Sequence, residues 1–190
     1  MIFEEMMNIQ VLPYNVCLNG VEYKYRLLKM KSKNGKEGGS PMKNSIIVPV
    51  DGSPHSFFAM TEALDLSKRL EMNIVLVNVQ HQIETLHTKM FFSSSDVNEY
   101  QNQLATEALK EVTDFLDKQQ ISYEKVVRIG YPIHEICKEA EERGAKYIII
   151  GSRGRGPLRG QMFGSVSLGV LHEANCPVLV VKGDKDKANA

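Results

Sequence analysis

The stretch Lys146-Tyr147-Ile148-Ile149-Ile150-Gly151-Ser152-Arg153-Gly154, followed after nine residues by Gly164-Ser165, decides the fold. Its apolar start predicts a buried strand, and residues 166–175 predict a short helix. A glycine-rich loop between a strand and a helix is where parallel α/β sheets bind phosphates. There, bare backbone and the N–H groups of the helix N-terminus can approach an anion. The stretch therefore predicts an anion site in a parallel sheet.

The charges around this loop also favour an anion. Arg153, Arg155 and Arg159 lie in the loop, and no acidic residue occurs from Arg143 through His172. The chain as a whole has 23 basic and 23 acidic residues, unlike a nucleic-acid-binding protein, which usually carries a basic surplus. We therefore expect a local positive field within a neutral protein that binds no nucleic acid.

Strand-like and helix-like segments alternate from Met42 onward. The predicted strands are 45–50, 73–79, 122–129, 146–150 and 177–181, and the predicted helices are 54–70, 96–120, 133–143 and 166–175. Ser53 and Pro54 are typical of an N-cap and a first helical position, and Asp96 is the predicted cap of the long helix. This order predicts an α/β fold, a five-stranded parallel sheet with helices on both faces, whose ligands bind at the carboxyl ends of the strands.

Three parts of the chain are expected to differ in organisation. Residues 1–41 form an N-terminal extension, partly flexible, in which Val16 to Leu28 can make a hairpin around Asn19-Gly20. An alternative hypothesis is that Met42 is the true start and that residues 1–41 are upstream sequence. Residues 42–182 form the predicted domain, and residues 183–190 are a charged tail.

Composition and the remaining motifs exclude several classes of protein. The three cysteines, Cys17, Cys137 and Cys176, form no CxxC pair, which favours a reducing cytoplasm, and no run is apolar enough to span a membrane. The P-loop and GxGxxG patterns are absent, which counts against a P-loop enzyme and a dehydrogenase. The five histidines are interpreted as structural, and Glu141-Glu142 as a solvated helix end. No catalytic residue is predicted.

Four segments resemble, in order and spacing, the universal stress protein family. They are Ile46-Ile47-Val48-Pro49-Val50-Asp51-Gly52-Ser53, Gly130-Tyr131-Pro132, the signature Gly151-x2-Gly154-x9-Gly164-Ser165, and Pro177-Val178-Leu179-Val180-Val181. The resemblance covers roughly residues 42 to 182. It implies the Rossmann-like fold of the adenine nucleotide alpha hydrolases and, because the glycine signature is present, binding of ATP or a related adenine nucleotide.

The resemblance also implies roles for particular residues. Asp51 would lie near the ribose or a phosphate-bound Mg²⁺, Val79 would present backbone groups to the adenine, and Gly130 would pass close to the base or sugar. The phosphates would lie against Gly154, Gly164, Ser165 and Ser167. The full set of expected nucleotide-binding residues is Pro49, Val50, Asp51, Gly52, Ser53, Val79, Gly130, Gly151, Ser152, Arg153, Gly154, Arg155, Gly164, Ser165, Val166 and Ser167.

A homodimer is expected through the last strand, Val178–Val181, because the outer side of that strand would otherwise leave unpaired backbone groups. The expected function is an adenine-nucleotide-binding regulatory or stress-response protein with an unknown protein partner. Two alternatives stay open: a slow Mg²⁺-dependent ATPase, and a nucleotide-free dimeric interaction module. The sequence does not distinguish between ATP and AMP.

Overall fold

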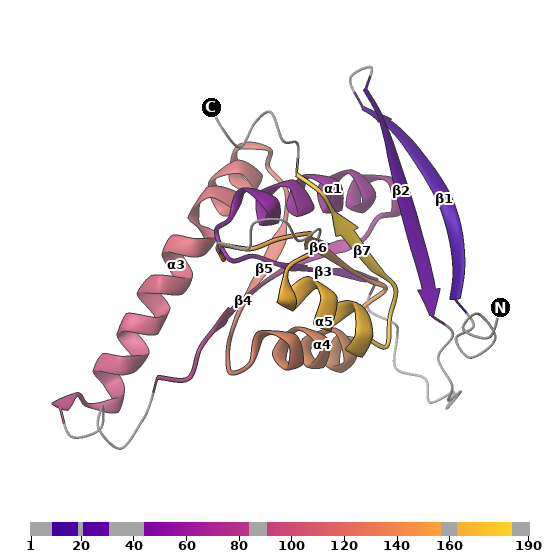
Figure 1. The fold of residues 1–190 in the computed structure, drawn as a ribbon. Coiled ribbons are helices and arrows are strands. Elements are labelled where there is room, and N and C mark those ends of the chain that lie inside the picture. Colours follow the sequence, from indigo (N-terminus) through magenta and orange to yellow (C-terminus); the bar gives the residue numbers. More distant parts are fainter. Residues whose placement is uncertain (1–8, 19–20, 31–43, 84–90, 157–162, 184–190) are drawn as a thin grey trace, which may run out of the picture.

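The computed structural model describes residues 9–18, 21–30, 44–83, 91–156 and 163–183 (Figure 1). Its strands are β1 (Ile9–Leu18), β2 (Val21–Met30), β3 (Ser45–Pro49), β4 (Asn73–Gln80), β5 (Tyr123–Ile129), β6 (Tyr147–Gly151) and β7 (Val178–Val181). Its helices are α1 (Pro54–Leu70), α3 (Ser94–Lys118), α4 (Pro132–Arg143) and α5 (Ser165–Glu173). The segments predicted from Met42 onward are all present, with ends that differ by at most two residues.

The strands form one sheet in the order β1-β2-β7-β6-β3-β4-β5. β3 to β7 run parallel to one another, which confirms the predicted five-stranded parallel sheet. Because β3 lies between β4 and β6, the chain order reverses at this point, and the carboxyl ends of β3 and β6 open onto the same edge. This is the position where doubly wound sheets bind their ligands.

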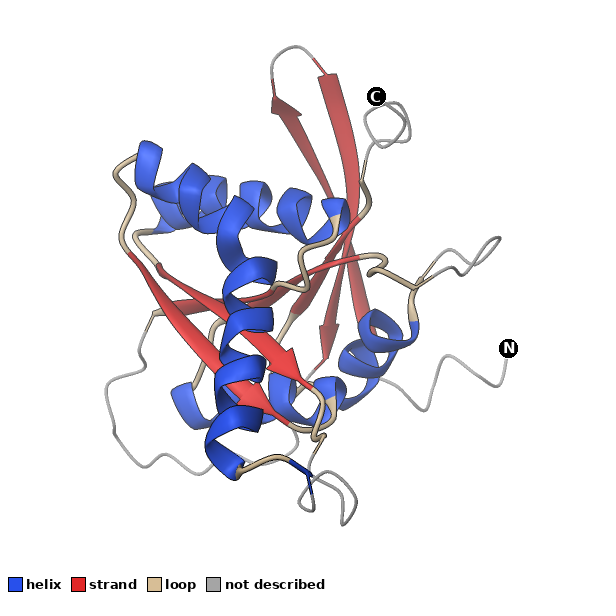
Figure 2. Ribbon diagram, turned by 90° about the vertical axis from the view of Figure 1, so that its left-hand side faces the viewer, coloured by secondary structure: helices blue, strands red, loops and turns tan. Residues whose placement is uncertain are grey.

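Helices cover both faces of the parallel strands (Figures 1 and 2). α1 and α3 pack on one face, where Met60 and Leu116 meet Leu76 and Ile149 in one apolar cluster. α4 and α5 pack on the other face, with Ile136 among the residues of a second cluster. β3 is buried at every residue, as a strand covered on both faces must be. The two clusters hold β3 and β6 firmly in place beneath the edge where both strands end.

The helix ends mostly follow the sequence signals. Ser53 caps α1, and its side chain accepts a hydrogen bond from the Ser56 N–H, with Pro54 at the start as predicted. The prediction that Asp96 caps the long helix is wrong. Ser93 is the N-cap, and Asp96 occupies the third helical position, where the two residues form a reciprocal capping box. Serine and aspartate are both common N-cap residues, and here the capping box places Ser93 at the N-cap and Asp96 inside the helix.

The N-terminal segment forms the expected hairpin, but it is longer than predicted and joins the sheet. β1 and β2 pair antiparallel from Ile9↔Met30 to Leu18↔Val21, and Leu28 of β2 pairs with Val178 of β7. The premise that β7 has an unpaired outer side is therefore wrong at Val178. Asn19 and Gly20, the predicted turn, lie outside the described residues, as do residues 183–190 apart from Gly183.

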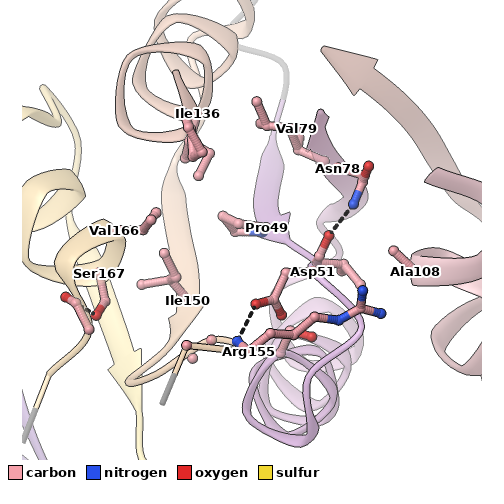
Figure 3. A pocket seen from close by; sticks show the side chains of 18 of the residues that line it. Pro49, Asp51, Asn78, Val79, Ala108, Ile136, Ile150, Arg155, Val166 and Ser167 are labelled. Atoms are coloured by element: carbon pink, nitrogen blue, oxygen red, sulfur yellow. Dashed lines mark hydrogen bonds between the residues drawn. The ribbon is translucent and has the colours of Figure 1, made fainter. Parts of the chain in front are cut away.

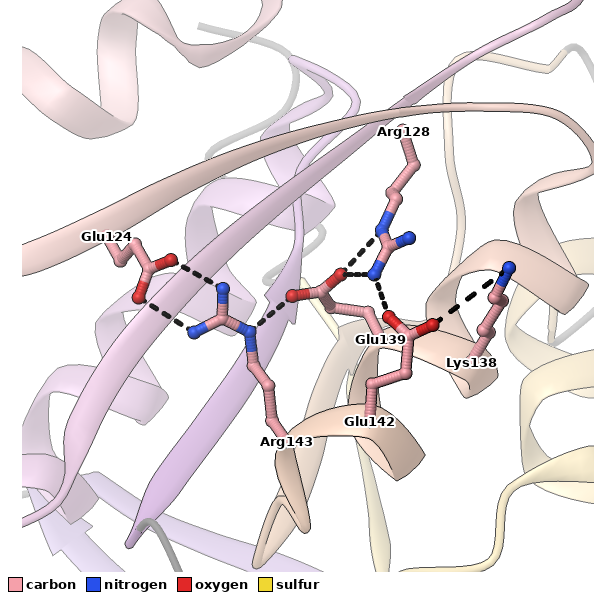
Figure 4. Close-up of polar contacts among 6 residues, drawn as sticks. All are labelled: Glu124, Arg128, Lys138, Glu139, Glu142 and Arg143. Atoms are coloured by element: carbon pink, nitrogen blue, oxygen red, sulfur yellow. Dashed lines mark hydrogen bonds and ion pairs between the residues drawn. The ribbon is translucent and has the colours of Figure 1, made fainter.

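Charged side chains join α4 to β5 at the opposite end of the sheet (Figure 4). Glu139, which is buried, accepts hydrogen bonds from Arg128 on β5 and from Arg143 on its own helix. Arg143 also donates to Glu124, with 2.7 Å between Nη1 and Oε2. Glu142 is exposed at the end of α4, as interpreted from the sequence, and it also pairs with Arg128. These residues and Lys138, 4.0 Å from Glu142, are called the β5–α4 ion-pair cluster below.

No helix within the described ranges has the length and apolar character needed to cross a membrane.

Candidate functional site

A cavity of about 410 Å³ lies at the carboxyl ends of β3, β4 and β6 (Figure 3). This volume falls within the range of roughly 300–1,000 Å³ that is common for small-molecule sites. The glycine-rich loop after β6 and the N-terminus of α5 form one side of it, and the β3–α1 turn another. The topology thus brings together the segments that the sequence predicted to share a site.

One part of the cavity wall is apolar and comes from both sheet and helices. Figure 3 shows Pro49, Val79, Ile136, Ile150 and Val166 around the same space. Such a wall can accept the flat face of an aromatic ring, because burying the ring removes apolar surface from water.

The backbone of Val79 offers polar groups beside this wall. The Val50 N–H donates to the Val77 carbonyl at 2.8 Å, so Val77 directs its backbone groups towards β3. Val79, two residues further, directs its groups the same way, but the pairing of β3 with β4 ends at Pro49↔Val77. The N–H and C=O of Val79 therefore face the cavity, where they can bond the polar edge of a base.

Asn78 fixes the point at which β3 leaves the sheet. Its side chain is 3% exposed and donates to the Val50 carbonyl, with Nδ2 and O 2.7 Å apart. Its Oδ1 in turn accepts a hydrogen bond from Gln80 at 2.6 Å. Sequence reasoning missed Asn78, although a single polar residue within an apolar strand was a signal that could have found it.

Asp51 lies in the middle of the site and bonds two loops. Its Oδ1 accepts a hydrogen bond from the Ser53 N–H at 3.0 Å, and its Oδ2 accepts one from the Arg155 N–H at 3.2 Å. The carboxylate therefore joins the β3–α1 turn to the glycine-rich loop. Gly52 follows at φ +77°, a conformation that favours glycine.

The N-terminus of α5 lines the cavity with backbone donors that its own helix does not use. Gly164 is the N-cap, and no side chain caps this helix. The first intrahelical bond runs from the Leu168 N–H to the Gly164 carbonyl, so the N–H groups of Ser165, Val166 and Ser167 have no partner within the helix. With the positive end of the helix dipole they form an anion site.

Ser152 and Ser167 hold this helix end against β6. The Ser152 carbonyl accepts a hydrogen bond from the Gly164 N–H at 2.7 Å, and the Ser167 hydroxyl lies 3.0 Å from the same oxygen. Ser167 is also 2.9 Å from the Gly164 carbonyl, so its hydroxyl proton is used within the protein. Ser167 would therefore bind an anion through its main-chain N–H and not through its hydroxyl group.

Two arginines give the site its charge. Arg153 and Arg155 both line the cavity and are exposed, whereas Arg159 lies outside the described residues. The field of Arg153 reaches His55. Burial lowers the pKa of His55 below 6.5, Arg153 lowers it further, and Asp51 opposes the change. His55 is not among the residues that line the cavity, but its titration reports on the charges of the site.

The expected nucleotide-binding residues divide into two groups. Those that line the cavity are Pro49, Val50, Asp51, Val79, Gly151, Arg153, Gly154, Arg155, Gly164, Ser165, Val166 and Ser167. Gly52, Ser53, Gly130 and Ser152 do not line it, and the cavity gives their predicted roles no support. The wall residues that the expected set left out are Ser56, Val77, Asn78, Gln80, His81, Leu104, Glu107, Ala108, Pro132, Ile136, Ile150, Gly156 and Phe163.

Within the part of the chain that the structure describes, no three His, Cys, Asp or Glu residues are grouped to hold a metal ion. Asp51 can still contribute one ligand to a Mg²⁺ that phosphates also bind, because each carboxylate oxygen keeps a second lone pair. Cys137 and Cys176 are not reactive groups, since burial raises the pKa of each thiol to about 11.

The fold and site define a class: a doubly wound α/β protein with a cavity beside a helix N-terminus at the switch point of a five-stranded parallel sheet. A sequence model of the Universal stress protein family matches residues 42–182. Universal stress protein YxiE of Bacillus subtilis (strain 168) is 30% identical over 148 residues, which is 74% of this chain and 100% of YxiE. The chain belongs to the universal stress protein family.

Solved structures agree with this assignment. The structure of MJ0577, a universal stress protein of Methanocaldococcus jannaschii, superposes with a TM-score of 0.64 at 27% identity, covering 76% of this chain and 99% of that one. UspA from Lactobacillus plantarum gives a TM-score of 0.63 at 23% identity, covering 75% and 99%. The Rossmann-like fold predicted for residues 42–182 is thereby confirmed.

Three further universal stress proteins were solved with adenine nucleotides. One contains cAMP (TM-score 0.59, 18% identity, 75% of this chain and 99% of that one). The Arabidopsis thaliana protein At3g01520 contains AMP (0.56, 20%, 76% and 94%). An Archaeoglobus fulgidus protein contains dAMP (0.54, 22%, 74% and 99%). At these identities the likeness to this chain is one of fold.

Proposed function

We propose that this protein binds an adenine nucleotide, AMP or ATP, and acts as a regulatory member of the universal stress protein family. The observation that carries the proposal is the uncapped N-terminus of α5, which opens onto an apolar-walled cavity at the switch point of the sheet. The cAMP, AMP and dAMP complexes of other family members support it.

The cavity suggests how the base and the sugar bind. The adenine ring lies against Pro49 and Ile136, where the wall is apolar on the sheet side and on the α4 side. The backbone groups of Val79 bond the polar edge of the base, since they have no partner from β3. The ribose then lies near Asp51, whose carboxylate accepts hydrogen bonds from hydroxyl groups.

The phosphates lie at the start of α5. The N–H groups of Ser165 and Val166 donate to the α-phosphate, and the helix dipole favours its charge. Further phosphates of ATP extend towards Arg153, which lines the same cavity. Mg²⁺, where it accompanies ATP, would take one carboxylate ligand from Asp51 and the others from phosphate and water.

Isothermal titration calorimetry of the full chain tests this proposal. We expect AMP and ATP to bind, in EDTA as well as in Mg²⁺, because the site on α5 consists of N–H groups. GTP is the matched control, since its base differs at the edge that faces Val79. Failure of both adenine nucleotides to bind at millimolar concentration would leave the nucleotide-free interaction module as the better explanation.

We also propose a cytoplasmic location and a homodimer. The cytoplasmic location rests on the scattered cysteines. The homodimer through Val178–Val181 now has an added requirement, because Leu28 of β2 pairs with Val178. A second copy must displace β2 or pair with the rest of β7, and sedimentation velocity of the full chain distinguishes a dimer from a monomer.

A further inference from the structure

We propose that Gly154 is a positioning residue whose missing side chain lets Asp51 hold the glycine-rich loop in register with α5. The family signature associates this glycine with phosphate. The contacts around it point instead to the protein's own carboxylate. The part of the inference that concerns ligand affinity rests on the proposed function, whereas the part that concerns loop position does not.

The contact between Gly154 and Asp51 is close. A Cβ placed on Gly154 would lie 2.5 Å from the Oδ2 of Asp51, and among the described residues, chain neighbours apart, the only other atom within 4 Å of it is the Cγ of Asp51. The carboxylate cannot move aside freely, because its two oxygens accept hydrogen bonds from the N–H groups of Ser53 and Arg155. An alanine at 154 would therefore displace Asp51 or the loop and break the bond to Arg155.

Backbone conformation does not explain the glycine. Among the described residues, the glycines with positive φ are Gly52, Gly130 and Gly144, so Gly154 has a backbone that alanine also adopts. Position 154 requires glycine because Asp51 occupies the space that a side chain would need.

The three glycines of the signature thus differ in what surrounds them. A Cβ on Gly151 would lie 2.6 Å from the His55 carbonyl group, so Gly151 serves the packing of α1 on β6. A Cβ on Gly164 would meet its nearest neighbour, the Cα of Arg153, at 3.5 Å, which is an ordinary contact. Of the three, Gly164 is the one at which the described residues leave room for a side chain.

The position of the loop matters for the ligand because the loop lies beside the anion site. Arg153 is next to Gly164, and the Ser152 carbonyl holds the Gly164 N–H. Asp51 bonds the same segment two residues further, at Arg155. The bond between Asp51 and Arg155 therefore fixes the segment that carries Arg153 past the start of α5.

A double-mutant cycle tests the inference with Gly154→Ala, Asp51→Ser and the double variant. Serine at 51 is shorter but can still accept the Ser53 N–H, as serine does in turns. In the nucleotide-free protein, we expect Gly154→Ala to lower the melting temperature by about 2–4 °C, as the loss of one such bond would. In the Asp51→Ser background the same change should have almost no effect. Gly156→Ala is the matched control, because no atom of the described residues, chain neighbours apart, lies within 4 Å of a Cβ there.

Ligand affinity supplies a second readout. Gly154→Ala should weaken ATP, whose further phosphates extend towards Arg153, about tenfold more than it weakens adenosine, which corresponds to the loss of one charge-assisted hydrogen bond. Equal losses for ATP and adenosine would show a general loss of structure and overturn the positioning role. Additive melting-temperature losses in the cycle would show that Gly154 does not act through Asp51. If wild type binds no nucleotide, the proposed function fails, but the nucleotide-free cycle still decides the contact.

Discussion

The β5–α4 ion-pair cluster and the carboxyl-edge site both gather charges beside the sheet, yet their charges have different partners. In the cluster, Glu139 is buried between Arg128 and Arg143, and each arginine also contacts a second carboxylate. At the site, the first N–H groups of α5 have no side-chain cap.

The difference shows how a structural group of charges can be told from a binding site. Charges that satisfy one another inside the protein stabilise the fold, because an unpaired buried charge would cost several kcal/mol. Donors that no group in the protein satisfies are instead available to a ligand. The two regions should therefore respond in opposite ways to substitution, one in stability and the other in affinity.

The largest effect is expected for Glu139→Ala. Removal of the buried carboxylate leaves Arg128 and Arg143, whose side chains are 25% and 20% exposed, without their shared partner. We expect the free energy of unfolding to fall by about 3 kcal/mol, at the low end for a broken buried pair because both arginines reach water. Urea denaturation measures this loss, and AMP affinity should stay unchanged. Glu141→Ala, on an exposed position of the same helix, is the control.

Gly164→Val should have the reverse effect. A branched side chain at the N-cap blocks the approach of phosphate to α5, so AMP affinity should fall about 100-fold, which corresponds to two lost charge-assisted hydrogen bonds. The fold should tolerate valine, because Gly164 has φ −75° and ψ 161°, an ordinary extended conformation. The free energy of unfolding should therefore change by about 1 kcal/mol at most. Unchanged AMP affinity would remove α5 from the site.

The smallest effect concerns pH. The pKa of His55 is lowered from 6.5, first by burial and then by Arg153, so the folded protein favours the neutral imidazole. This contribution to stability is fully present above pH 6.5 and is lost as the pH falls through the lower folded pKa. An NMR titration of the nucleotide-free protein should place the His55 midpoint below 6.5, and Arg153→Ala should move it upwards. A midpoint that Arg153→Ala leaves unchanged would show that the charge of Arg153 is satisfied elsewhere.

Local sequence signals predicted the parallel sheet because β3, β4, β6 and β7 are mostly apolar runs next to a turn or cap, whereas β5 also carries charged residues. The pairing of Leu28 with Val178 was not predictable in the same way. Residues 9–30 form a hairpin by local pattern, but which strand edge it joins depends on contacts distant in sequence.

The residues of the site also differ in whether local sequence could predict them. The glycine signature and the Asp51 turn could be found, since loops that bind phosphate carry recognisable residues. Ile136 and Ala108 could not, because helices bring them to the cavity and their spacing reads as ordinary core. The proposed role of Gly154 could not be predicted either, because Asp51, which lies close to it in space, is 103 positions earlier in the chain.

A crystal structure of the full chain with AMP tests the central claim most directly. The account predicts phosphate oxygens about 2.7–3.2 Å from the main-chain nitrogens of Ser165 and Val166, with the adenine against Pro49. A nucleotide bound elsewhere, or a start of α5 that stays without phosphate in crystals saturated with AMP, would contradict it.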